Sequence, residues 1–180
     1  IRIRVGDGPV TNWGDETRVV LAFNEQVLLA RHRLNSLADD ATILLEASWA
    51  SHEDPAIRQA WAEAMEELSE KNYRIILVPY EEQTLTVVEN ARRGKNMFAL
   101  GVLCWIYQRN LDRVRDQIKD NFRKKSEEIY TNSVALLDLG HAWAEENLEE
   151  RIDVPVRQLD DAPSVVMNGN DAFAFGAIAA

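Results

Sequence analysis

The sequence predicts an α/β fold in three layers, in which a mostly parallel sheet lies between flanking helices and a helical C-terminal half follows. Three apolar runs, at residues 18–23, 41–47 and 73–80, are typical of parallel strands that are buried on both faces. The segments between these runs have helical patterns, and the strand pattern disappears after Tyr80. The alternation of strand and helix favours a doubly wound α/β layer with right-handed crossovers.

An additional strand is predicted at the start of the chain, where residues 1–5 alternate apolar and basic side chains. This pattern is typical of an amphipathic strand near a sheet edge, and a turn is expected at residues 6–9, Gly-Asp-Gly-Pro. A Gly-x-Gly pattern also occurs in phosphate-binding loops, but those loops lead directly into a helix. Here a proline follows instead, so we interpret the stretch as a plain turn.

Two helices are predicted between the apolar runs, and both have recognisable start signals. Asn24 is a good N-cap for a helix over residues 24–34, and Glu25 suits its first turn. Asp54 and Pro55 provide the N-cap and the first helical residue of the second helix. The second helix has an apolar stripe and a plausible stop, formed by Ile57, Trp61, Ala64, Leu68 and Asn72.

The second half of the chain is predicted to be helical and to share one core with the first half. A loop or short helix at residues 81–93 comes first, and residues 94–110 then form a buried helix. Residues 111–125 and 126–148 form two more helices, the latter with Ser126 as its N-cap. The first of these two has a stripe of Leu111, Val114, Ile118 and Phe122.

The last stretch predicts a domain boundary. Residues 149–164 are polar and acidic and contain two prolines, as expected of an extended linker. A short strand, a turn at Asn168-Gly169 and an apolar helix with Asn170 as its N-cap follow. This helix reaches residue 180 without a C-cap, so we expect it to pack against something that the chain does not contain.

Composition excludes several classes of function. The net charge of −10 argues against a nucleic-acid partner, because phosphate neutralisation requires clustered Lys and Arg. Cys104 is the one cysteine, so neither an internal disulfide nor four-thiolate zinc or iron–sulfur ligation is available. The apolar stretch at residues 97–107 is too short to cross a membrane. These features predict a protein of the reducing cytoplasm that has no membrane partner.

The sequence predicts no catalytic, cofactor-binding or metal-binding residues of its own. His32, His52 and His141 lie on separate segments without the spacing of metal ligands. Cys104 is expected to be a buried, inert thiol. The paired carboxylates are expected to be solvated, and they are Glu66-Glu67, Glu81-Glu82, Glu145-Glu146 and Asp160-Asp161.

A basic cluster at a predicted helix start is the best candidate site. Arg92, Arg93 and Lys95, followed by Asn96, lie where the positive end of the helix dipole opposes a cation. One interpretation is that they pair with a neighbouring acidic loop. The other is that they contact another subunit or an anionic ligand, since a helix start offers free N–H groups.

Several stretches together resemble the 2-oxoacid:acceptor (ferredoxin) oxidoreductases, and specifically the alpha subunit of the two-subunit, 2-oxoglutarate type. The most specific parts are Lys-Asn-Met-Phe-Ala-Leu-Gly at residues 95–101 and Gly-Asn-x-Ala at residues 169–172. A further series is Phe122, Lys125, Asn132, Ala135, Leu136 and Gly140. The matching stretches are RIRVGDGPV, RVVLAFNEQVLL, GKNMFALGVLCWIY, FRKKSEEIYTNSVALLDLGHAW and NGNDAFAFGAIAA.

The resemblance implies a domain division. Residues 1–148 correspond to the gamma domain, residues 149–164 to a linker, and residues 165–180 to the beginning of the thiamine-diphosphate pyrimidine-binding domain. Family members have a strand and a Gly-rich loop before the segment that matches Ile1. This element is expected to be missing here, which would leave an exposed sheet edge. The interface residues implied are Arg92, Arg93, Lys95, Asn96, Asn168, Gly169 and Asn170.

The resemblance also implies a function. The family decarboxylates a 2-oxoacid such as 2-oxoglutarate oxidatively to an acyl-coenzyme A and reduces ferredoxin. Its holoenzyme uses thiamine diphosphate, magnesium, coenzyme A and an iron–sulfur cluster, which the beta subunit carries together with the pyrophosphate-binding half. The present segment would then be an inactive assembly part of a hetero-oligomer, a dimer of alpha–beta pairs. The alternative is a stand-alone α/β module that binds a partner or an anionic ligand, and the sequence does not select the 2-oxoacid.

Overall fold

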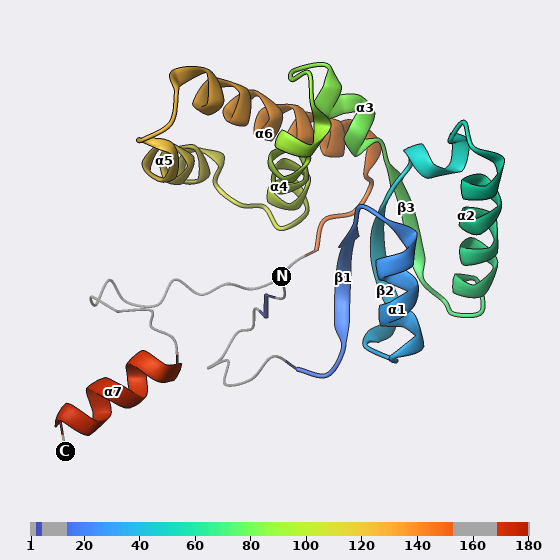
Figure 1. Ribbon diagram of the computed structural model, residues 1–180, viewed down its shortest axis with the longest axis horizontal. Coiled ribbons are helices and arrows are strands. Elements are labelled where there is room, and N and C mark those ends of the chain that lie inside the picture. The colour runs from blue at the N-terminus through green and yellow to red at the C-terminus, as the bar shows by residue number, and fades with distance from the viewer. Residues whose placement is uncertain (1–2, 5–13, 153–168, 180) are drawn as a thin grey trace.

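A computed structural model describes residues 3–4, 14–152 and 169–179, with the side chains of α7 described from 173 to 178. Its sheet contains β1 (Thr17–Ala22), β2 (Leu37–Glu46) and β3 (Arg74–Val78) in the order β1-β2-β3, and both pairings are parallel. The helices α1 (Glu25–Arg33) and α2 (Pro55–Leu68) connect the strands (Figure 1). The predicted parallel α/β layer is therefore confirmed.

Both predicted helix caps between the strands are confirmed. The Asn24 side chain accepts hydrogen bonds from the backbone N–H groups of Gln26 and Val27. Asp54 accepts one from Ala56, and Pro55 is the first residue of α2. These caps satisfy backbone donors that a helix start would otherwise leave unpaired.

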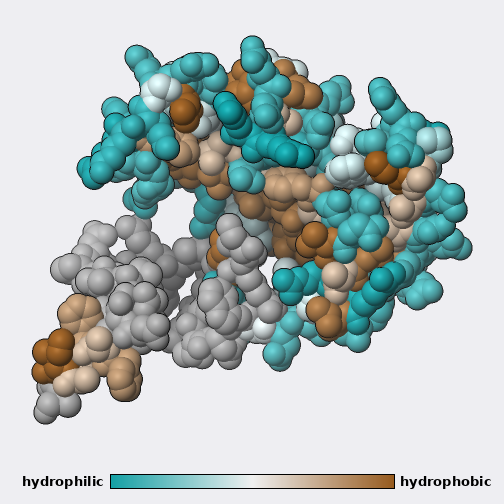
Figure 2. Space-filling view, viewed as in Figure 1, coloured by the Kyte–Doolittle hydropathy of each residue, from teal (hydrophilic) through white to brown (hydrophobic). Residues whose placement is uncertain are grey.

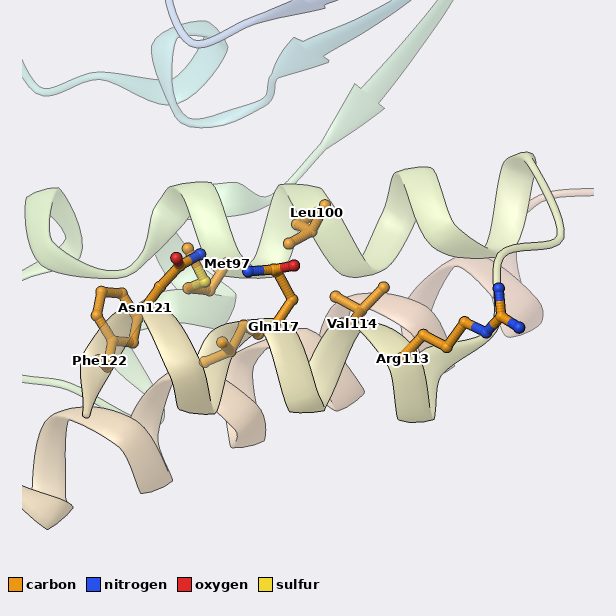
Figure 3. A pocket seen from close by; sticks show the side chains of 8 residues that line it. Met97, Leu100, Arg113, Val114, Gln117, Asn121 and Phe122 are labelled. Carbon is orange, nitrogen blue, oxygen red and sulfur yellow. The ribbon is translucent and has the colours of Figure 1, made fainter. Parts of the chain in front are cut away.

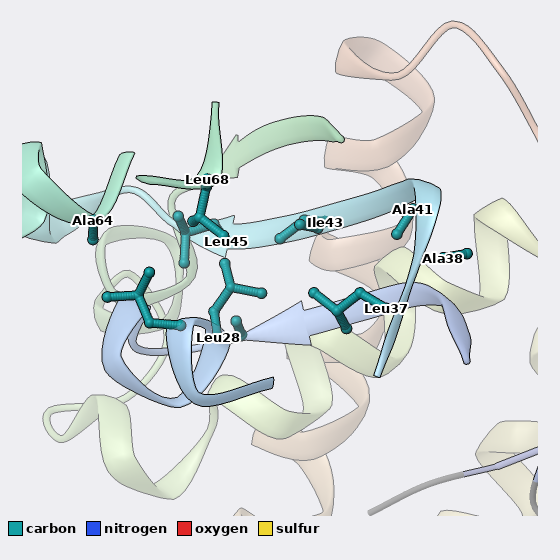
Figure 4. Close-up of a cluster of buried hydrophobic side chains, with 10 residues drawn as sticks. Leu28, Leu37, Ala38, Ala41, Ile43, Leu45, Ala64 and Leu68 are labelled. Atoms are coloured by element: carbon teal, nitrogen blue, oxygen red, sulfur yellow. The ribbon is translucent and has the colours of Figure 1, made fainter. Parts of the chain in front are cut away.

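One face of the sheet is covered by α1 and α2. Ala41, Ile43 and Leu45 alternate along β2 on this face, as the two-residue period of a strand requires. Leu28 of α1 and Leu68 of α2 are almost completely buried against them (Figure 4). This all-aliphatic cluster is the first of the two main cores.

The other face is covered by the helical half, which comprises α3 (Tyr80–Leu85), α4 (Lys95–Ile106), α5 (Leu111–Phe122) and α6 (Glu127–Asn147). Leu44 of β2 and Val78 of β3 pack here with Phe98 and Val102 of α4 and Ala144 of α6. Figure 2 shows apolar residues gathered at the junction between the helical half and the sheet. The predicted third layer and the shared core are both confirmed.

Helix α5 belongs to a smaller, separate core. Its predicted stripe packs on Cys104 and Leu137, and Ile118 is its buried member. Two short 3₁₀ helices are also present: η1 (Ser48–Ser51) lies between β2 and α2, and η2 (Ala91–Arg93) lies between α3 and α4. The region predicted as a loop or short helix at residues 81–93 thus contains all of α3 except Tyr80, and all of η2.

Several element boundaries differ from the prediction. β2 begins at Leu37, four residues before the predicted run. Leu37 pairs with Thr17 of β1, and the register then shifts, so that the next pair is Val19 with Thr42. α2 ends at Leu68 rather than near Asn72. The backbone N–H of the next residue, Ser69, bonds back to carbonyl groups of the last turn. Ser126 precedes α6, but its side chain makes no capping hydrogen bond; its carbonyl accepts from Ile129 instead.

The ends of the chain are described only in part. Of the predicted strand at residues 1–5, Ile3 and Arg4 are described and have no regular secondary structure. The turn at residues 6–9, most of the linker, the short strand after residue 164 and Asn168 lie outside the described residues. Helix α7 (Gly169–Ala179) is present, and it includes Asn170 in its first turn instead of starting after it. Phe173, Phe175 and Ile178 on α7 are exposed by 80%, 62% and 82%.

Candidate functional site

The candidate site lies at the carboxyl end of the sheet, where β2 ends in Glu46. Glu46 is the last residue of this strand, and its carboxylate is fully buried. One of its oxygens accepts a hydrogen bond from the backbone N–H of Glu81 at 3.2 Å, and the other accepts from Ser48 at 3.3 Å. Glu46 therefore caps the start of α3, whose own N-cap residue, Pro79, makes no side-chain cap hydrogen bond.

Lys95 completes this site. Its ammonium nitrogen lies 3.1 Å from a carboxylate oxygen of Glu46 and 2.5 Å from one of Glu81. Lys95 is the first residue of α4, where the helix dipole disfavours a cation. The two carboxylates compensate that cost, so the ion-pair network ties the ends of β2, α3 and α4 together.

The predicted basic cluster is thus divided. Lys95 points inward and pairs with acidic side chains, as the first of our two interpretations predicts. Arg92, Arg93 and Asn96 are exposed, and neither arginine has an ion pair within the described part of the chain. Glu81 departs from the prediction that the paired carboxylates are simply solvated, because Lys95 recruits it into the network.

Tyr80 lies beside this network and is fully buried. Its ring packs edge-on against Phe23 and Phe98, with centroid distances of 5.0 and 5.9 Å. Burial, together with the negative charge of Glu46, raises the pKa of the Tyr80 phenol far above its ordinary value. Tyr80 therefore stays neutral, and its role at this site is packing between the sheet and α4.

Glycines allow the helices behind the site to touch. A Cβ on Gly101 of α4 would lie 2.0 Å from the carbonyl oxygen of Leu137, and one on Gly140 of α6 would lie 2.0 Å from that of Phe98. Any larger residue would push α4 and α6 apart. Gly94 is similarly enclosed by side chains of α3 and α6. This close contact fixes the start of α4, and with it Lys95.

A groove of about 410 Å³ lies on the other side of α4, between α4 and α5 (Figure 3). Its apolar lining comes from both helices, and three polar side chains of α5 follow its length. The apolar lining residues are Met97, Leu100, Val114, Ile118 and Phe122. The sequence predicted the α5 stripe but not this groove beside it.

The remaining candidates from sequence are accounted for by local packing. His32 contacts the Tyr73 hydroxyl at 3.0 Å, and His52 stacks on Trp49. Burial raises the pKa of the Cys104 thiol, which agrees with the predicted inert thiol. Across residues 14–152, the histidines, cysteine and carboxylates form no group of three that could hold a metal ion.

This geometry provides two kinds of contact, one inside the domain and one on its surface. The buried ion pair and the glycine contact position α4 on the sheet, whereas the groove and the exposed arginines face outward. None of the described helices is both long and apolar enough to span a membrane. Sequence analysis missed Glu46; a glutamate directly at the end of an apolar run, in ATILLEA, was the available signal.

Comparisons with known proteins agree with this picture. Residues 1–143 match the family described as pyruvate ferredoxin/flavodoxin oxidoreductase. The chain is 26% identical over 188 residues to the 2-oxoglutarate oxidoreductase subunit KorA of Mycobacterium tuberculosis, covering 99% of this chain but 28% of that protein. Its fold is similar, with a TM-score of 0.71 and 20% identity, to a 2-oxoglutarate:ferredoxin oxidoreductase from Magnetococcus marinus solved with 2-oxoglutarate, coenzyme A and succinyl-CoA bound. That match covers 95% of this chain and 27% of the solved one.

Proposed function

The chain belongs to the pyruvate ferredoxin/flavodoxin oxidoreductase family, and we propose that it is the gamma-domain part of the alpha subunit of a 2-oxoacid:ferredoxin oxidoreductase. The complete enzyme would convert a 2-oxoacid such as 2-oxoglutarate to an acyl-coenzyme A and pass the electrons to ferredoxin. The family match over residues 1–143 is the observation that carries this proposal. The chain spans less than a third of the relatives that it matches, so the activity is that of the larger protein.

We assign this segment a structural role in assembly. The motif that resembles the family most specifically, residues 95–101, begins with the paired Lys95 and ends at the helix contact of Gly101. Gly140 of the second motif series lies on the other side of the same contact. The shared residues therefore support a packing role, because each of these side chains or glycines holds α4 in place.

We propose that the candidate site does not hold the cofactor that the family implies. A diphosphate bound through magnesium requires free carboxylate or carbonyl oxygens, but Glu46 and Glu81 are occupied by Lys95. We therefore propose that the rest of the alpha subunit and the beta subunit bind thiamine diphosphate, magnesium, coenzyme A and the iron–sulfur cluster. No catalytic step is assigned to this segment.

The domain division proposed is residues 1–148 for the gamma domain, 149–164 for the linker and 165–180 for the start of the pyrimidine-binding domain. The exposure of large apolar side chains on α7 supports it, since Phe173 and Ile178 would be buried by a neighbouring domain. The partners would be the beta subunit and, through it, ferredoxin, in a cytoplasmic hetero-oligomer. Asn168, Gly169 and Asn170 stay proposed interface residues.

The alternative, a stand-alone module that binds an anion at the start of α4, has less support. Such a site would rely on Lys95, whose charge is already neutralised by two carboxylates. The exposed Arg92 and Arg93 are compatible with a protein partner.

The proposal is tested with the full-length subunit and its partner subunit, purified separately and mixed. We expect ferredoxin reduction that depends on a 2-oxoacid and on coenzyme A, and none from residues 1–180 alone. The proposal fails if the full-length subunit, reconstituted with thiamine diphosphate and its partner, reduces ferredoxin with none of the 2-oxoacids pyruvate, 2-oxoglutarate and a branched 2-oxoacid.

A further inference from the structure

Residues 149–152 follow α6 without regular secondary structure, yet they contact two other elements of the domain. The Glu150 carboxylate pairs with the guanidinium of Arg74, the first residue of β3. The backbone N–H of Ile152 donates a hydrogen bond of 2.9 Å to the carbonyl oxygen of Ile106, the last residue of α4. We call residues 149–152 the strap, because they tie the end of α6 to the sheet and to α4.

Arg151 adds a third contact between these two. Its guanidinium carbon lies 4.8 Å from the centroid of the Trp105 ring, and Trp105 is a buried residue of α4. A cation over the face of an indole ring is attracted by the negative charge of that face. The strap is also held by apolar packing at its ends, since Leu148 belongs to the core beside α4 and Ile152 packs against it.

The strap completes the end of α4. The last carbonyl groups of a helix have no partner within the helix, and Ile152 satisfies the one on Ile106. The other end of α4 is held by the ion pairs of Lys95, and its middle by the close contact with α6 at Gly101. The strap is therefore bound to one of the most firmly held elements of the domain.

The order of the contacts restricts the direction of the chain as well as its place. They fall on the consecutive residues 150, 151 and 152, which together span no more than about 11 Å. One contact is with the sheet and two are with α4, so the segment cannot rotate about any single one of them. A flexible linker at this place would instead leave the two parts that it joins free to move relative to one another.

We propose that the strap fixes the direction in which the chain leaves this domain, and thereby holds the rest of the subunit at a defined position relative to it. Residues 149–152 then belong to the domain by their contacts, although the proposed division counts them as linker. The inference rests on the proposed function in one respect, because it requires the chain to continue into a larger subunit.

A purely local role makes a different prediction. If the strap served only as a cap for α4, its removal would lower the stability of this domain and leave the arrangement of the whole subunit unchanged. The test therefore needs two measurements, one of stability and one of overall dimensions.

The experiment measures small-angle X-ray scattering of the full-length subunit, separated by size exclusion so that its oligomeric state is the same in every sample. The variant Glu150→Ala/Arg151→Ala/Ile152→Pro removes the carboxylate, the guanidinium and the N–H of the three contacts together. We expect its radius of gyration to rise by more than about 5%, because a released domain samples positions farther from the rest of the subunit.

Glu149→Ala is the matched control. Glu149 is an exposed carboxylate of the same strap, and it makes neither an ion pair nor a side-chain hydrogen bond with the described residues. We expect its radius of gyration to equal that of the wild type. The double variant Glu150→Ala/Arg151→Ala keeps the N–H of Ile152 and should show a smaller rise, and it decides the test if the triple variant does not fold.

Urea unfolding of each variant provides the second measurement. A variant that loses stability but keeps the wild-type radius of gyration shows a local cap and overturns the inference. An unchanged radius without loss of stability overturns it as well, and so does an equal rise in Glu149→Ala.

The proposed function fails separately. If the radius of gyration responds as expected but the subunit and its partner reduce ferredoxin with none of the three 2-oxoacids, the activity assignment is wrong and the strap inference holds. If 2-oxoacid-dependent reduction is observed but the radius does not respond, only the strap inference is wrong.

Discussion

The two faces of the sheet are packed in different ways. The face under α1 and α2 is filled by large aliphatic side chains such as Ile43, Leu45 and Leu68, which interdigitate. Behind the other face, α4 and α6 approach so closely at Gly101 and Gly140 that their backbones are in contact. The first arrangement is sensitive to the removal of atoms, and the second to their addition. The part of the chain that resembles its family most specifically lies in the second.

The largest effect is expected where a single methyl group is added between α4 and α6. Gly101→Ala places a Cβ 2.0 Å from a backbone oxygen, which cannot move away as the end of a flexible side chain can. We expect the free energy of unfolding to fall by about 4 kcal/mol, above the usual ~1–3 kcal/mol for overpacking. Urea unfolding of the purified chain measures it.

Gly176→Ala in α7 is the matched control, because nothing lies within 4 Å of the added Cβ. We expect it to leave the main unfolding transition unchanged. Equal effects of the two substitutions would contradict a special role for the α4–α6 contact.

A smaller effect is expected from removing atoms on the opposite face. Leu45→Ala leaves a cavity in a fully buried position of β2 and should cost about 3 kcal/mol. Val27→Ala on the exposed side of α1 should cost less than about 0.5 kcal/mol. If Leu45→Ala were as mild as Val27→Ala, the aliphatic face would not be a close-packed core.

The Lys95 network should show coupling between its members. Lys95→Met leaves the buried Glu46 carboxylate without its cation, and we expect a loss of about 2–3 kcal/mol. Adding Glu46→Gln removes the buried charge as well, so the double variant should recover part of that loss. A double-mutant cycle in urea measures the coupling, and strictly additive losses would show that the two residues act independently.

The smallest effect at neutral pH is expected from Tyr80→Phe, which has a clear signature at high pH. Because burial and Glu46 raise its pKa, folded Tyr80 stays neutral while an unfolded tyrosine ionises above pH 10. Its contribution to stability is therefore complete below pH 10 and is lost as the pH rises, by up to a factor of about ten in the unfolding equilibrium constant per pH unit. Between pH 10 and 11 the free energy of unfolding of the Tyr80→Phe variant should fall less steeply than that of the wild type. An identical slope for the two proteins would contradict this.

Sequence patterns predicted what depends on local regularity. The strand runs, the caps at Asn24 and Asp54 and the stripe of α5 all depend on side-chain period or on the nearest turn, and they are confirmed. The cap expected from Ser126 is absent, because the first turn of α6 closes through backbone groups instead.

The candidate site was predicted less completely, because it depends on contacts between distant segments. Lys95 was identified from its place at a helix start, but its partner Glu46 lies 49 residues away by number (95 minus 46) and required the fold to bring it close. Gly101 and Gly140 were recognised as motif residues, yet their shared contact follows only from the crossing of α4 and α6. The groove depends on the gap between α4 and α5, which no sequence period specifies.

The central claim is that this domain holds the enzyme together and leaves the chemistry to other parts. Lys95→Met in the full-length subunit, assembled with its partner, tests it most directly through parallel measurements of thermal dissociation and of kcat per assembled complex. We predict that the complex dissociates at a lower temperature while kcat for 2-oxoacid-dependent ferredoxin reduction changes less than about twofold. A large fall in kcat with unchanged dissociation would contradict the claim.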